Sequence, residues 1–143
     1  MTTEERTNTE KIVINAEGAA MGRIAAYAAK QSLLGKKIII VNSEKAIVTG
    51  RKDTTLNEHL VSRQRGGNLI NGPFYPSAPE KIMKRTIRGM LPYKQERGRS
   101  AFKRIKTYEG LPEEFKNDKM IKLEEKKGMI LGDLAGLLKG RSK

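Results

Sequence analysis

The sequence predicts an α/β domain built on parallel strands, and three neighbouring segments support this prediction. Residues 12–14 and 38–41 are short, unbroken runs of β-branched residues, a pattern typical of strands that are covered on both faces. The alanine-rich residues 22–34 between them have apolar positions at helical spacing, and Gly35 follows as a helix stop. A connection of this length fits the right-handed crossover that joins two parallel strands.

Further along the chain, apolar periodicity and turn residues predict the remaining elements. They are a helix over 51–65, a helix that begins at Pro79, short strands at 105–108 and 120–123, and a final helix over 130–138. The helix over 51–65 is predicted from Leu56, Leu60 and Val61. Residues 66–78 are rich in Gly, Asn, Pro and aromatic residues, which is typical of an ordered loop.

The length and the residue types narrow the class of protein. Residues 1–143 suit one domain, and we expect the polar residues 1–10 to be a mobile tail. The absence of cysteine excludes disulfides and cysteine nucleophiles and fits a reducing, intracellular compartment. One histidine cannot form a two-histidine metal motif, and no apolar stretch is long enough to span a membrane. We therefore expect no catalytic residue, cofactor, metal or membrane partner.

The positive charge of the chain is concentrated in its middle. The formal net charge is +13, and residues 51–106 carry 14 basic residues against 4 acidic ones. The segments on either side are nearly balanced. A charge of this sign and density indicates a polyanionic partner.

The helix that begins at Pro79 has two chemically different faces. The cationic face carries Lys81, Lys84, Arg85 and Arg88, and the apolar face carries Ile82, Met83, Ile87 and Met90. Like charges at this spacing repel each other by roughly 0.2–0.5 kcal/mol per pair, so folding alone does not favour them. A solubilising surface is the alternative, but such surfaces usually mix signs, and Glu80 is the one acid nearby.

Basic residues continue on both sides of this helix. After it, residues 89–99 are predicted to form a loop that follows a nucleic-acid backbone, since glycine permits close approach to a phosphate and Arg97 and Arg99 present planar guanidinium groups. Before it, two further basic pairs flank the helix over 51–65. The candidate RNA-binding residues are Arg51, Lys52, Arg63, Arg65, Lys81, Lys84, Arg85, Arg88, Lys94, Arg97, Arg99, Lys103 and Arg104.

Three other features each leave two interpretations. Phe74, Tyr75 and Tyr93 lie among the cations and could stack on an unpaired base or pack under a loop. His59 is interpreted as a part-buried hydrogen-bonding residue in preference to a catalytic base. Residues 18–22 follow a strand and open a helix, but their glycines depart from the dinucleotide-binding spacing, so close packing of strand and helix is the better explanation.

Several segments together resemble the ribosomal protein L-thirteen family of the large subunit. The likeness extends over about residues 11–115 in the same order, and its most specific part is Arg-Thr-Ile-Arg-Gly-Met-Leu-Pro at 85–92. The other matching segments are residues 21–25, 34–36, 41–50, 97–99 and 104–110. Residues 71–75 with 78–79 resemble the archaeal and eukaryotic branch, whereas about the last 25 residues match poorly.

The resemblance implies a three-layer α/β domain with a four-stranded, mainly parallel sheet and basic helical and loop extensions. It also implies a non-catalytic structural component of the cytoplasmic ribosome that binds large-subunit ribosomal RNA and lies beside other ribosomal proteins. One alternative is an RNA-binding repressor that binds a hairpin of a messenger RNA, which the same protein could also do as a second role. Another is a nucleotide-dependent enzyme that holds its ligand at residues 18–22.

Overall fold

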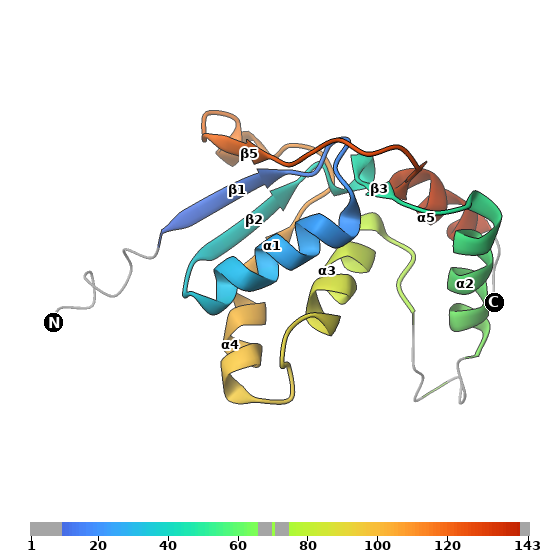
Figure 1. Cartoon of the computed structure of the whole chain (residues 1–143), viewed down its shortest axis with the longest axis horizontal. Coiled ribbons are helices and arrows are strands. Elements are labelled where there is room, and N and C mark those ends of the chain that lie inside the picture. The colour runs from blue at the N-terminus through green and yellow to red at the C-terminus, as the bar shows by residue number, and fades with distance from the viewer. Residues whose placement is uncertain (1–9, 66–69, 71–74, 141–143) are drawn as a thin grey trace, which may run out of the picture.

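The centre of the molecule is a four-stranded sheet in which all neighbouring strands are parallel (Figure 1). The computed structural model describes residues 10–65, 70 and 75–140. The strands, in the order β4-β2-β1-β5, are Ile105–Thr107, Lys37–Val41, Lys11–Asn15 and Met120–Lys122. The predicted α/β class with a four-stranded parallel sheet is confirmed.

Three helices cover one face of this sheet. They are α1 (Met21–Leu33), α3 (Pro79–Gly89) and α4 (Glu96–Lys103), and α1 contacts both of the others (Figure 1). Ile14, Ile40 and Ile105 point from the strands into this layer and are fully buried. Gly35 ends α1 in the left-handed region, with a φ of 97°, as its sequence position predicts.

The other face of the sheet is covered by a shorter piece of chain. Val13, Ile39 and Val41 pack there against Phe115, which belongs to the 3₁₀ turn η3 (Glu113–Phe115). The ring of Phe115 lies 5.7 Å from the ring of Tyr108. Successive strand residues point to opposite faces, so cover on both faces explains why the strands have unbroken apolar runs.

A second group of elements packs at one end of the sheet. It comprises α2 (Lys52–Gln64), α5 (Leu131–Gly140), η2 (Ser43–Lys45) and an antiparallel pair, β3 (Ile47–Val48) with β6 (Met129–Ile130). Leu131, Leu134 and Leu138 of α5 are buried in the same core as α3. None of the helices in the described ranges has the length and apolarity needed to cross a membrane.

The predicted loop over residues 89–99 is wrong in its second half, because α4 begins at Glu96. Ala101 is buried against α1, and Gly98 is buried where the helix meets the preceding turn. A Cβ atom at Gly98 would overlap with the carbonyl of Pro92. Gly98 therefore permits contact between two parts of this chain, not close approach to a phosphate.

Three smaller expectations also differ from the structure. Met90 lies beyond the end of α3 and is 45% exposed, so it leaves the apolar face, and Leu91 is buried in its place. Val61 is 40% exposed on the outer side of α2. A Cβ atom at Gly22 would have no neighbour within 4 Å, so close packing does not explain that glycine.

Replacing Gly98 with Ala is expected to lower the free energy of unfolding by about 1–3 kcal/mol, because the methyl group meets backbone that cannot give way. The matched control is Gly136→Ala in α5, where a Cβ atom has open space. There the better helix propensity of alanine should raise stability by up to about 1 kcal/mol. Urea denaturation followed by circular dichroism measures both. Equal stabilisation by the two substitutions would contradict the packing at Gly98.

Candidate nucleic-acid interface

The cationic surface is positioned by the apolar face of α3. Ile82, Met83 and Ile87 are at most 5% exposed and fix the rotation of the helix against α1 and β4. The helix has a proline in its first turn, which suits that position because the ring presets the backbone angle there. Lys81, on the opposite side, is exposed.

Three cations of α3 lie over aromatic rings of the same chain. The pairs are Lys84 with Phe102 at 5.0 Å, Arg85 with Tyr75 at 4.0 Å and Arg88 with Tyr93 at 5.2 Å, measured from the charged atom to the ring centroid. Each such contact stabilises by about 0.5–1 kcal/mol at an exposed site and restricts a long side chain to one region. The rings thus hold the cations in place without removing their charge.

This arrangement changes the interpretation of the aromatic residues. Tyr75 and Tyr93 each have an arginine of the same chain over one face of the ring. That ring face is therefore occupied before any RNA base binds. Phe102 plays the same part for Lys84 but was not identified from the sequence, because it belongs to the unpredicted helix α4. Phe74 lies outside the described residues.

None of the thirteen candidate residues makes an ion pair with another described residue. The ion pairs of the described ranges join Lys11 to Asp118, Lys36 to Glu10, Lys116 to Glu113, Lys122 to Glu125 and Lys126 to Glu124. All of these lie in the charge-balanced parts of the chain. The middle segment therefore presents positive charge that carboxylates of the described chain do not neutralise.

The one acid on α3 turns away from the cations. Glu80 lies beside Glu109, and hydrogen bonding to Glu80, followed by burial and the charge of Glu80, raises the pKa of the Glu109 carboxyl. The backbone carbonyl of Glu80 accepts a hydrogen bond of 2.9 Å from the Thr107 hydroxyl at the end of β4. Across the described ranges, no three acidic or histidine side chains gather in a way that could hold a metal ion.

Two of the candidate arginines also bind helix ends. The Nη1 atom of Arg63 donates to the carbonyl oxygen of Leu138 at 2.8 Å, and Nη1 of Arg104 donates to that of Ser32 at 2.9 Å. Carbonyls in the last turn of a helix lack partners within the helix and attract positive charge, so these contacts stabilise α5 and α1. A guanidinium group has five donor hydrogens, so each arginine keeps donors for another ligand.

The candidates fall into two classes of exposure. Lys84, Arg85, Arg88, Arg63 and Arg104 are half-buried, and each is held by a ring or a carbonyl of the chain. The remaining candidates are exposed, and of these Arg99 donates to the Lys94 carbonyl at 3.1 Å. The candidate set thus combines held, half-buried cations with exposed ones, whose long side chains can reach an irregular polyanion.

Figure 1 shows that the C-terminal ends of α2 and α3 and the N-terminal end of α4 all project from the same side of the molecule, away from the sheet. These helix ends carry three of the candidates: Arg65 directly follows α2, Arg88 is in the last turn of α3, and Arg97 is in the first turn of α4. Arg51 and Lys52 lie at the opposite end of α2, a helix of 13 residues, which spans about 20 Å at 1.5 Å per residue. The structure therefore separates this pair from the rest of the predicted set.

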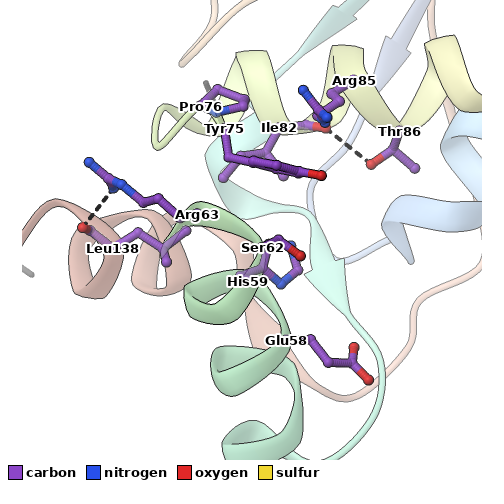
Figure 2. Close-up of a pocket in the computed structure, with 10 residues that line it drawn as sticks. All are labelled: Glu58, His59, Ser62, Arg63, Tyr75, Pro76, Ile82, Arg85, Thr86 and Leu138. Atoms are coloured by element: carbon purple, nitrogen blue, oxygen red, sulfur yellow. Dashed lines mark hydrogen bonds between the residues drawn. The ribbon is translucent and has the colours of Figure 1, made fainter. Parts of the chain in front are cut away.

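A cleft that was not predicted from the sequence lies where α2, α3 and α5 meet. Its volume is about 350 Å³, and it is lined by Arg63, Arg85 and Tyr75 among others (Figure 2). The cleft also contains His59, whose Nδ1 lies 3.0 Å from the carbonyl oxygen of Thr55. The interpretation of His59 as a part-buried hydrogen-bonding residue is confirmed.

These features define the class of protein: an α/β domain with a preorganised, unneutralised cationic surface, as found in proteins that bind nucleic-acid phosphates. The family model for ribosomal protein L13 matches residues 9–114. The chain belongs to the ribosomal protein L13 family, as its resemblance implies. This family is structural and non-enzymatic, so the alternative of a nucleotide-dependent enzyme is wrong.

Individual relatives agree with the family assignment. The large ribosomal subunit protein uL13 of Methanosarcina barkeri is 48% identical over 114 residues, which are 79% of this chain and 81% of the relative. That of Methanopyrus kandleri is 50% identical over 72% of this chain and 64% of the relative. That of Methanocaldococcus jannaschii is 43% identical over 86% of this chain and 93% of the relative.

Proposed function

We propose that this chain is a structural constituent of the large ribosomal subunit, where it binds ribosomal RNA and supports assembly of the subunit in the cytoplasm. The relatives that support membership of this assembly are named as proteins of the large ribosomal subunit. The observation that supports the interaction is the set of three ring-held cations on α3, Lys84, Arg85 and Arg88, none of which pairs with a carboxylate of the described chain.

The thirteen candidate residues would contact the RNA from three parts of the surface. The half-buried cations of α3 provide a fixed centre, and the exposed Lys94, Arg97, Arg99 and Lys103 extend it along the following turn and α4. On α2, Arg63 and Arg65 extend it to the other side, and Arg51 and Lys52 form a separate contact at the far end of the helix. Neighbouring ribosomal proteins would contact the remaining, charge-balanced surface.

The surface suits RNA that is recognised by its shape. Double-stranded RNA has a deep, narrow major groove that side chains do not read, so recognition rests on phosphates, 2′-hydroxyls and exposed unpaired bases. Arginine is favoured for phosphate because its planar group donates two parallel hydrogen bonds. The fixed guanidinium groups of Arg85 and Arg88 provide this kind of contact.

We expect RNA binding to weaken steeply with salt. If about seven phosphates are neutralised, the logarithm of the binding constant should fall against the logarithm of salt concentration with a slope of roughly −5 to −6. Filter binding of a large-subunit ribosomal RNA fragment between 50 and about 300 mM salt measures it. Lys127→Gln, at an exposed residue outside the candidate set, is the control and should keep the slope. A slope near zero for the unaltered protein would contradict the proposal.

Binding of a messenger hairpin remains an alternative second role, since a hairpin presents the same A-form phosphates to the same surface. Affinity capture of the chain from cells separates the two roles. Recovery with whole large subunits supports the ribosomal role, whereas enrichment of one messenger in the free pool of the protein supports the second.

A further inference from the structure

The cleft between α2, α3 and α5 is the least open of three hollows that share lining residues, and together these hollows are called the groove below. At about 350 Å³ it is in the size range of sites that bind small organic groups. Two shallower hollows adjoin it: one shares Ser62 and extends along α2 to Arg65, and the other shares Tyr75 and extends to Lys81. The groove thus has an aromatic and polar centre with a cation beyond each end.

The ring of Tyr75 lies in this central cleft and separates Arg85 from the side chains on the opposite wall. The guanidinium of Arg85 lies 4.0 Å from the ring centroid on one side. Figure 2 shows the ring between Arg85 on that side and the side chains of His59 and Ser62 on the other. The ring face that is free of the arginine therefore faces the cleft and can accept a flat group.

Polar atoms of the cleft walls are available to a ligand. A carbonyl oxygen can only accept a hydrogen bond, so Nδ1 of His59 is the donor in its 3.0 Å contact with Thr55, and Nε2 is left for another partner. The hydroxyl groups of Ser62 and Tyr75 make no hydrogen bond with any other residue of the described chain. A ligand with both donors and acceptors on its edge, such as a nucleobase, can pair with these groups.

The charged residues around the cleft determine which part of a nucleotide each region of the cleft would bind. Arg63 and Arg85 line it, and neither is in an ion pair within the described ranges. Among the described residues that line it, Glu58 is the one with a carboxylate, and it is exposed. Arg63 and Arg85 attract phosphate and Glu58 repels it, so we expect the phosphates to lie at the arginine part of the wall and the uncharged base to occupy the rest of the cleft.

We propose that this cleft receives one unpaired base of the bound ribosomal RNA, stacked on the free face of Tyr75, with the adjacent phosphates on Arg85 and Arg63. This inference rests on the proposed function and names the part of the RNA that one site would take. It also gives the groove a direction, from Arg65 through the cleft to Lys81, along which a short single-stranded segment would lie.

His59 allows a direct test, because it is the only histidine of the chain and gives one unambiguous imidazole signal in NMR. We expect adenosine, guanosine and cytidine monophosphates to shift this signal saturably at millimolar concentration. Inorganic phosphate at equal concentration and ionic strength can reach the arginines but brings no base, so it should cause a much smaller shift. An equal shift with phosphate alone, or none with the nucleotides, would overturn the proposal.

Substitutions at Tyr75 separate stacking from other effects. Tyr75→Leu should abolish the nucleotide-induced shift and weaken binding of the RNA fragment about tenfold, as expected for loss of a stacked base. Tyr75→Phe keeps the ring and should retain most of both. Tyr93→Leu is the matched control, since it also removes a ring from beneath an arginine but lies outside the cleft. A shift abolished equally by Tyr93→Leu would overturn the assignment to the cleft.

A cross-link shows what occupies the cleft in the assembled subunit. The chain has no cysteine, so Ser62→Cys carries a single thiol for a photoreactive reagent. We expect a cross-link to one nucleotide of the ribosomal RNA, and none from Ala26→Cys on the exposed side of α1. A cross-link from Ser62→Cys to a neighbouring protein would overturn the proposal in favour of a peptide ligand.

The proposed function and this inference fail in different ways. If the chain does not bind ribosomal RNA with a steep salt dependence, the proposed function is wrong. If that binding is intact but Tyr75→Leu leaves both the affinity and the nucleotide-induced shift of His59 unchanged, only the occupant of the cleft is wrong.

Discussion

Replacing Ile87 with Asp is expected to unfold the domain, lowering the free energy of unfolding by roughly 4 kcal/mol or more. Ile87 is fully buried in the core formed by α1, α3 and the strands. The substitution removes the apolar contacts of a buried side chain and places a carboxylate where no water reaches it. Typical domains are stable by only about 5–15 kcal/mol, so a loss of this size removes most of the margin of a domain at the lower end of that range. Urea denaturation followed by circular dichroism measures the effect.

The neighbouring residue is the control for this substitution. Arg88 lies on the opposite face of α3, with its guanidinium over the ring of Tyr93. Arg88→Glu should leave the far-ultraviolet spectrum unchanged and reduce stability by less than about 1 kcal/mol, the size of one exposed ring contact. It should still weaken RNA binding by about 1–3 kcal/mol. Equal loss of folded signal in both variants would show that the two faces of α3 are wrongly assigned.

Reversing the three ring-held cations together, Lys84, Arg85 and Arg88 to Glu, should cause the largest loss of RNA binding. Three charge-assisted contacts at about 1–3 kcal/mol each predict a loss of at least a hundredfold, and the salt slope should become shallower by roughly 2 to 3. Filter binding of the RNA fragment at several salt concentrations measures both quantities. The variant should remain folded, because the apolar face of the helix is unchanged.

A second triple variant separates site binding from net charge. Lys37, Lys119 and Lys127 are exposed, lie outside the candidate set, and are in no ion pair within the described ranges. Reversing them to Glu changes the net charge by the same amount as the first variant. If both variants bind RNA equally weakly, the interaction depends on overall charge and the cationic face of α3 is not a specific surface.

The main layers of the fold were predictable because their residues repeat a simple pattern. The strands around Ile14 and Ile40 are covered on both faces and so have continuous apolar runs, while α3 has one buried and one charged face. Helix α4 was missed because its eight residues begin with Glu-Arg-Gly-Arg-Ser and show little apolar periodicity. Strands β3 and β6 have two residues each, too few to establish any period.

The parts of the candidate site that were not predicted depend on contacts between distant segments. The sequence places Tyr75 and Tyr93 among cations, but only the folded chain shows that Arg85 and Arg88 lie over their rings. Arg63 likewise appears as one more surface cation until its contact with the Leu138 carbonyl is seen. The cleft has walls from three helices, and no local pattern specifies such a junction.

The strand order also bears on how the protein is made. Residue 13 pairs with residue 120, so β1 acquires its neighbour on that side only when most of the chain has left the ribosome. The elements that present the basic surface, from β2 through α3 to β4, precede β5 in the chain and do not need it as a neighbour. Contacts between residues far apart in sequence form slowly because closing a long loop is entropically unfavourable. The edge of the sheet beside β1 is therefore expected to close after the chain that carries α2 and α3 has been made, and the packing of α5 against these helices follows later still.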